Sequence, residues 1–114
     1  MSVKLSTRQV GDVSVVDVAG RITLGEGSSA LRDLMRDMVS KGQKKMLLNL
    51  GEVSYIDSSG IGELVSGFTT VTNNGGQLKL LGLTKRVKDL LQITKLYTVF
   101  DVHDDEAGAI RSFA

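Results

Sequence analysis

Short apolar runs alternate with segments of helical periodicity along most of the chain. A short strand is predicted at Val3–Leu5 and a second at the β-branched run Val13–Val18. The turn-like Gln-Val-Gly-Asp segment between them predicts a hairpin. Between residues 30 and 40, apolar residues recur at the i, i+3, i+4 and i+7 spacing of one helical face. We expect Ser28 or Ser29 to cap this helix, because serine side chains accept from the free N–H groups of a first turn.

The rest of the chain continues this alternation of strands and helices. Further strands are predicted at residues 45–50, 77–82 and 98–102. Further helices are predicted at residues 59–73, after Thr84, and after Asp104 or Asp105, with Ala107, Ile110 and Phe113 facing inward. Two strands followed by helix–strand pairs predict one α/β domain over residues 1–114, with a mixed, mostly parallel sheet.

The helix predicted at residues 59–73 has one apolar stripe, made of Ile61, Leu64, Val65, Phe68 and Thr72. The opposite side carries Gly60, Glu63, Gly67 and Thr70. A glycine inside a helix costs about 0.5–1 kcal/mol relative to alanine, so Gly62 and Gly67 need an explanation. For Gly62 we favour close packing within the domain. For Gly67, close packing and the docking of a partner protein on a smooth helix face both stay open.

Composition and charge restrict the classes of partner. The 114 residues are 41% hydrophobic, which is enough for one core. The net charge is +1 and no basic or acidic block stands out, so we expect no binding to nucleic acid. No run approaches the roughly 20 apolar residues of a membrane span, and the N-terminus lacks the apolar region of a secretory signal. We therefore expect a cytoplasmic protein with no direct membrane insertion.

The residues that enzymes use are scarce. The chain has no cysteine, and its one histidine, His103, lies in the acidic stretch Asp-Val-His-Asp-Asp-Glu. No G-x-S-x-G motif and no phosphate-binding loop are present. We expect no catalytic residue, no metal site and no cofactor. A response-regulator receiver would place its phosphoacceptor at an aspartate such as Asp57, but the acidic pair that binds magnesium is missing.

The segment Asp57-Ser58-Ser59-Gly60 combines a carboxylate and two hydroxyls at the predicted start of a helix. Such residues commonly cap helices, so capping alone carries little information. A helix N-terminus has partial positive charge and free N–H groups, and it tolerates a phosphate. Phosphorylation there would add about −1.5 to −2 charge to an exposed tip while the fold stays unchanged.

Three segments resemble the bacterial anti-sigma factor antagonists of the STAS domain family. These are LLNLGEVSYIDSSGIGELV, NNGGQLKLLGL and VKDLLQITKLYTVFDV. The resemblance covers most of the chain, and the Asp-Ser-Ser-Gly element is its most specific feature. It implies a mixed sheet covered mainly on one side by about four helices.

The resemblance also implies a partner-switching role. The unphosphorylated form would bind an anti-sigma factor with serine kinase activity and free the sigma factor. Phosphorylation of Ser58 would end binding, and a serine phosphatase of the PP2C type would reverse it. Asp57 would shape the site, Ser59 would cap the helix, and Gly60, Ile61 and Glu63 would lie near the docking face. The chain is expected to be a monomer or weak dimer.

One segment departs from the family pattern. Family members often read Gly-Glu-Leu-Asp after the second strand, and the acids help to contact the partner, but this chain reads Gly-Arg-Ile-Thr. Arg21 and Thr23 therefore indicate a solvated loop of altered charge or a partner with a different surface. Alternative roles within the family are a subunit of a lipid-transport ABC complex and a scaffold in stress signalling.

Overall fold

One five-stranded sheet runs through the molecule, with its strands in the order in which they occur along the chain. The computed structural model describes residues 3–113. The strands are β1 (Val3–Val10), β2 (Val13–Ile22), β3 (Lys45–Ile56), β4 (Gln77–Leu81) and β5 (Asp101–His103). The helices are α1 (Glu26–Ser40), α2 (Ser58–Asn73), α3 (Lys85–Ile93) and α4 (Glu106–Arg111).

The pairing of the strands confirms the predicted mixed sheet. β1 and β2 form an antiparallel hairpin, and β2, β3, β4 and β5 are successive parallel neighbours. The parallel strands are joined by the crossovers through α1, α2 and α3, which is the connection that parallel pairing requires. The α/β domain with an N-terminal hairpin is therefore as expected.

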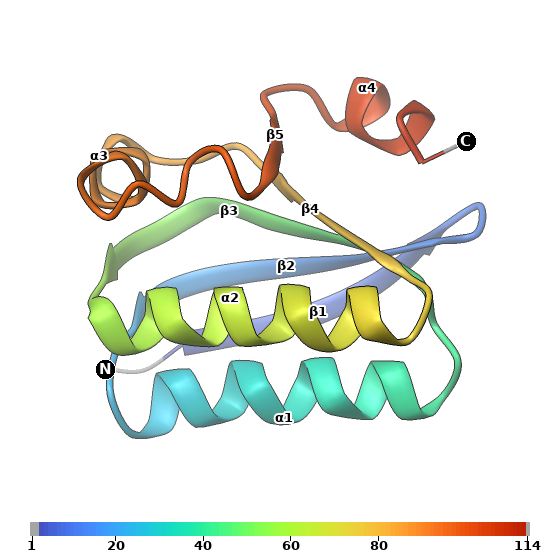
Figure 1. Cartoon of the computed structure of the whole chain (residues 1–114), viewed down its shortest axis with the longest axis horizontal. Helices are drawn as coiled ribbons and strands as arrows, with labels where there is room; N and C mark the ends of the chain where they lie inside the picture. Colours follow the sequence, from blue (N-terminus) through green and yellow to red (C-terminus); the bar gives the residue numbers. More distant parts are fainter. Residues whose placement is uncertain (1–2, 114) are drawn as a thin grey trace.

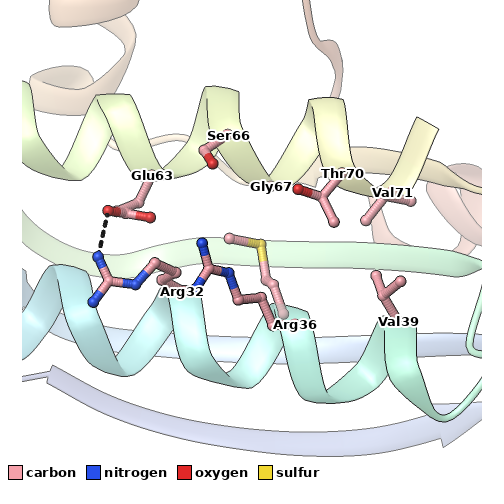
Figure 2. A pocket seen from close by; sticks show the side chains of 9 residues that line it. Arg32, Arg36, Val39, Glu63, Ser66, Gly67, Thr70 and Val71 are labelled. Atoms are coloured by element: carbon pink, nitrogen blue, oxygen red, sulfur yellow. Dashed lines mark hydrogen bonds and ion pairs between the residues drawn. The ribbon is translucent and has the colours of Figure 1, made fainter. Parts of the chain in front are cut away.

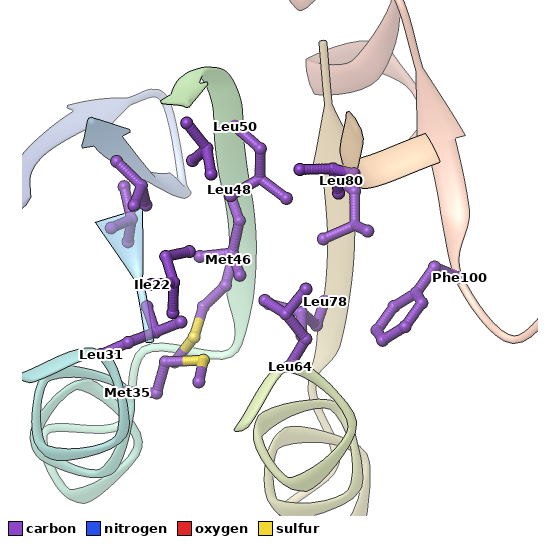
Figure 3. Close-up of a cluster of buried hydrophobic side chains, with 14 of the residues drawn as sticks. Ile22, Leu31, Met35, Met46, Leu48, Leu50, Leu64, Leu78, Leu80 and Phe100 are labelled. Carbon is purple, nitrogen blue, oxygen red and sulfur yellow. The ribbon is translucent and has the colours of Figure 1, made fainter. Parts of the chain in front are cut away.

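Helices α1 and α2 lie side by side along one face of the sheet (Figure 1). Side chains from β3 and β4, among them Met46, Leu48 and Leu80, point to this face and pack with Leu31 and Leu64 of the two helices (Figure 3). Helix α3 adds two fully buried residues to the same core. This arrangement confirms that most of the helices serve one main core.

The other face of the sheet carries a second, smaller core around the C-terminal segment. Its members alternate with those of the main core along β2, β3 and β4, and they are Val13, Val15, Leu47, Leu81, Ala109 and Phe113. Because apolar side chains are buried on both faces, β3 begins as the nearly continuous apolar run seen in the sequence. Ala107, predicted to face inward, is exposed, and Ala109 takes the inward position.

Several elements extend beyond their predicted bounds. β2 continues to Ile22 and β3 to Ile56, because the two strands pair over their whole length despite two register shifts. α1 begins at Glu26, four residues before the predicted start, after Gly25 with a φ of 97°. Ser28 does not cap the helix, because it lies inside the first turn and its hydroxyl donates to the Thr23 carbonyl over 2.9 Å.

The buried face of α2 is rotated from the predicted stripe. Val71 is buried and Thr72 is exposed. Gly60 and Gly67, placed on the exposed side by the sequence, are both buried. Gly67 faces α1 across the helix interface (Figure 2), and a Cβ there would lie 2.5 Å from Met35 Sδ. Close packing within the domain therefore explains Gly67.

Candidate functional site

Asp57 organises the junction between β3 and α2. Its Oδ1 accepts from the Gly60 N–H over 2.9 Å, which makes it the N-cap of α2. Its Oδ2 accepts from the Leu24 N–H over 3.1 Å, in the loop between β2 and α1. Burial alone would raise the pKa of Asp57, but the N–H groups of Gly60, Leu24 and Ser59 hold that pKa below its usual value. Asp57 is therefore an anionic link between two loops.

The two serines after Asp57 lie inside the helix. Ser58 is the first residue of α2 and is exposed, and Ser59 follows it and is partly buried. The prediction that Ser59 caps the helix is wrong, because the aspartate provides the cap. Within residues 3–113, Ser58 Oγ makes no hydrogen bond that would hold it in the fold. Its hydroxyl is thus available at the positive end of a helix of 16 residues.

Two glycines bring the starts of α1 and α2 against the end of β2. A Cβ on Gly60 would lie 2.5 Å from the Ile22 carbonyl oxygen, and one on Gly27 would lie 2.7 Å from the Arg21 carbonyl oxygen. The Asp57 N–H donates to the same Ile22 carbonyl over 3.3 Å. Because backbone blocks both positions, Gly60 has a structural reason to be glycine, and Ile61 beside it is also buried.

An exposed apolar residue and a cationic cluster lie beside this junction. Leu24, whose N–H binds Asp57, is 79% exposed. The guanidinium carbons of Arg21 and Arg86 lie 4.7 and 4.5 Å from the centroid of the Tyr55 ring. We call Arg21, Tyr55 and Arg86 the arginine–tyrosine cluster. Thr23 is partly exposed and lies between Arg21 and Leu24 in the sequence.

Glu63 lies one turn further along α2, at the interface with α1. Its carboxylate accepts from Arg32 Nη1 over 3.4 Å, and its side chain is only 18% exposed (Figure 2). Arg36 and Ser66 line the same shallow depression between the two helices. Glu63 therefore contributes an ion pair within the fold, and part of its carboxylate still faces the surface.

Three side chains of the kinds that form catalytic triads meet at β5, where His103 Nε2 lies 3.1 Å from Asp101 Oδ2 and 3.4 Å from Ser112 Oγ. In a catalytic triad the acid and the serine contact different ring nitrogens, whereas both contacts here use Nε2. Within residues 3–113 no cluster of metal-ligating side chains is found, and no helix has the length and apolarity to cross a bilayer.

The comparisons with known proteins identify the family of the chain. The model of the STAS domain family matches residues 4–109. The chain belongs to the STAS domain family. It is 30% identical, over 97% of its own length and the whole of the relative, to the anti-sigma-B factor antagonist of Bacillus subtilis.

Solved structures share the fold of this STAS domain. An anti-sigma factor antagonist from Mycobacterium paratuberculosis is 18% identical and superimposes with a TM-score of 0.86, covering 97% of this chain and 93% of that one. The Bacillus cell fate determinant SpoIIAA in its phosphorylated form is also 18% identical, with a TM-score of 0.77 over 97% of this chain and all of that one. Identities this low establish the architecture alone.

The structure brings most of the predicted site residues of this STAS domain together around the start of α2, but sequence reasoning missed two features of the site. The bond from Leu24 to Asp57 joins residues 33 positions apart. The ring of Tyr55 lies under two arginines from different elements. Arg21 lies opposite Tyr55 in the register of β2 against β3, and the register shifts between these strands hide that pairing from the sequence.

Proposed function

We propose that this STAS domain is an anti-sigma factor antagonist that switches partners through phosphorylation of Ser58. The unphosphorylated chain binds an anti-sigma factor with serine kinase activity and thereby frees a sigma factor. The kinase transfers the γ-phosphoryl group of ATP to Ser58 Oγ, which loses its proton, and ADP leaves. A serine phosphatase of the PP2C type hydrolyses the phosphoserine and restores binding.

The position of Ser58 is the observation that carries this proposal. The side chain is exposed at the first position of α2, while Asp57 holds the cap and the loop. Phosphorylation of Ser58 therefore removes no hydrogen bond on which the fold depends. The names of the relatives, above all the full-length match to an anti-sigma-B factor antagonist, support the same function.

The docking face that we propose surrounds this serine. Its exposed or partly exposed members are Arg21, Thr23, Leu24, Asp57, Ser58, Ser59 and Glu63. The buried residues Gly60, Ile61 and Gly67 act through the shape of the backbone beneath this face rather than by contact with the partner. A partner would thus bind a rigid surface, in which only the Ser58 hydroxyl is changed, by phosphorylation.

Phosphorylation by a candidate kinase tests the site directly. The wild type, Ser58→Ala and Ser59→Ala are incubated with the kinase and labelled ATP. We expect label on the wild type and Ser59→Ala, and none on Ser58→Ala. The label should survive hydroxylamine, which removes an acyl phosphate from an aspartate such as Asp57. Label that persists on Ser58→Ala would overturn the assignment.

A charge-mimicking variant separates the switch from the fold. Ser58→Asp places a carboxylate in the first turn of α2, where it is expected to stabilise the helix by about 0.3–1 kcal/mol. Its melting temperature should therefore match or exceed that of the wild type, while its affinity for the kinase falls. A collapse of the melting temperature would show that Ser58 is structural. Unchanged affinity would contradict control of docking by charge at this position.

A further inference from the structure

The arginine–tyrosine cluster holds two cations that the fold does not neutralise. Among residues 3–113, neither Arg21 nor Arg86 has a carboxylate within salt-bridge distance. By contrast, Arg8 bonds to two carboxylates and Arg32 to Glu63. The cluster is exposed at both arginines, so the two guanidinium groups stay accessible to another molecule.

The Tyr55 ring orders these cations in advance. A guanidinium stacked on an aromatic ring gains from the negative ring face and keeps its N–H edge free for a carboxylate. Arg21 comes from β2 and Arg86 from the first turn of α3, so the fold brings them to one ring from residues 65 positions apart along the sequence. Ordered side chains lose less entropy on binding than free ones, which favours a specific contact.

We propose that the arginine–tyrosine cluster docks an acidic segment of the anti-sigma partner, an inference that rests on the proposed function above. The occupant carries Asp or Glu carboxylates, which the two guanidinium forks bind in bidentate fashion. Leu24, 79% exposed and three residues after Arg21, adds an apolar contact at the edge of the same surface. The net charge of the whole chain is only +1, so the local cluster and not a general basic surface selects this partner.

An acidic partner also explains how a phosphate on Ser58 ends binding. Tyr55 and Ser58 are three residues apart, so their Cα atoms are separated by at most about 10 Å. The Debye length at 0.1 M salt is also about 10 Å, so charges at this separation still interact. Phosphorylation would add about −1.5 to −2 charge next to the acidic segment. The phosphate repels that segment and competes with it for the arginines.

Charge-reversal variants test the proposal on the full-length chain. Binding of the unphosphorylated protein to the purified kinase domain is measured by calorimetry for the wild type, for R21E/R86E, for R21Q/R86Q and for Lys88→Glu. Lys88 is exposed on α3, two residues from Arg86 and turned away from it, and serves as the control for charge on the same helix. Far-ultraviolet dichroism and thermal melts establish that each variant is folded.

We expect R21E/R86E to bind at least about 100-fold more weakly than the wild type, and R21Q/R86Q about 10-fold more weakly, as for charge-assisted hydrogen bonds at an interface. Lys88→Glu should stay within about 3-fold, as for a rim charge. The affinity of the wild type should fall as salt rises, and that of R21Q/R86Q should fall less steeply.

Two other results would overturn the inference and leave the proposed function standing. In the first, both double variants bind and are phosphorylated like the wild type, so the partner contacts the face elsewhere. In the second, the variants change only the self-association of the isolated chain in sedimentation, so the occupant is a second copy. If the wild type neither binds the kinase nor accepts phosphate, the proposed function fails and this inference fails with it.

Discussion

At the scale of single residues, Asp57 has the most consequences for the site. One carboxylate caps α2 and holds the Leu24 loop, so it fixes the backbone on both sides of Ser58. Ser58 is therefore exposed on a fixed backbone, where the proposed phosphorylation would leave the cap and the loop unchanged. This division of roles differs from the one that the family resemblance implied, in which Ser59 provided the cap.

Replacing Asp57 with alanine should lower the free energy of unfolding by more than the loss of an ordinary N-cap does. Loss of a cap costs about 0.5–2 kcal/mol, and the Leu24 N–H also loses its acceptor, so we expect a total of about 2 kcal/mol. Asp105→Ala is the matched control, because Asp105 caps α4 through Gly108 over 2.7 Å and holds no second loop. Urea unfolding measures the free energies, and amide exchange at Leu24 should accelerate only in Asp57→Ala. Equal losses in the two variants would contradict the linking role.

Two glycines of α2 should respond in opposite ways to alanine. The close packing expected at Gly62 is wrong, because this residue is exposed and nothing lies within 4 Å of an added Cβ. Gly62→Ala should therefore stabilise the helix by about 0.5–1 kcal/mol. At Gly67 the new methyl group would overlap Met35, and overpacking there should cost about 1–3 kcal/mol. Thermal melts of the two variants provide the comparison. The loss for Gly67→Ala combined with Met35→Ala should be smaller than the sum of the two single losses, and strictly additive losses would contradict the packing explanation.

At the scale of elements, the sequence predicted the order and type of every strand and helix, because hydrophobic period and turn residues are local signals. The sequence-based prediction failed for element boundaries and side-chain contacts that depend on residues far away in the sequence. β2 extends through polar residues because β3 pairs with it, and α1 starts early because Gly25 can adopt a positive φ and Thr23 accepts from Ser28. The partners of Leu24 and Tyr55 likewise lie on other elements. Phosphorylation of Ser58 stays a prediction, which rests on the resemblance of four consecutive residues, Asp57 to Gly60, to the family motif.

An ion pair ties α4 to the hairpin, in addition to the packing of Ala109 in the smaller core. Arg8 of β1 bonds to Glu106 of α4 over 2.5 Å and to Asp17 of β2 over 2.7 Å. The side chains of Arg8, Asp17 and Glu106 are 40%, 33% and 39% exposed, so solvent weakens both ion pairs. Glu106→Gln should therefore cost about 1 kcal/mol or less in global stability. Its main effect should be faster amide exchange in α4, while exchange in α2 stays unchanged. Equally faster amide exchange in α2 and α4 would show that the ion pair of Glu106 does not stabilise α4 locally.

At the scale of the whole molecule, several carboxylates share one response to acid. The Arg8 guanidinium holds the pKa values of Asp17 and Glu106 below their usual range, and hydrogen bonds from His103 and Lys79 lower that of Asp101. The backbone N–H groups around Asp57 do the same for its pKa, against the effect of burial.

The free energy of unfolding should therefore fall in acid. The unfolded chain takes up protons near the usual values of 3.8 for Asp and 4.5 for Glu, and the folded chain takes them up at lower pH. Each group thus stabilises the fold above its unfolded pKa and loses that contribution as the pH falls through its folded pKa. Urea unfolding measures this free energy. The contribution of these carboxylates should change little between pH 7 and pH 5, and it should decline below about pH 4.5. Arg8→Gln should show a shallower decline, because Asp17 and Glu106 then titrate near their usual values in both states. A wild-type stability that stays constant or rises down to pH 3 would contradict the assignment of these carboxylates as stabilising anions.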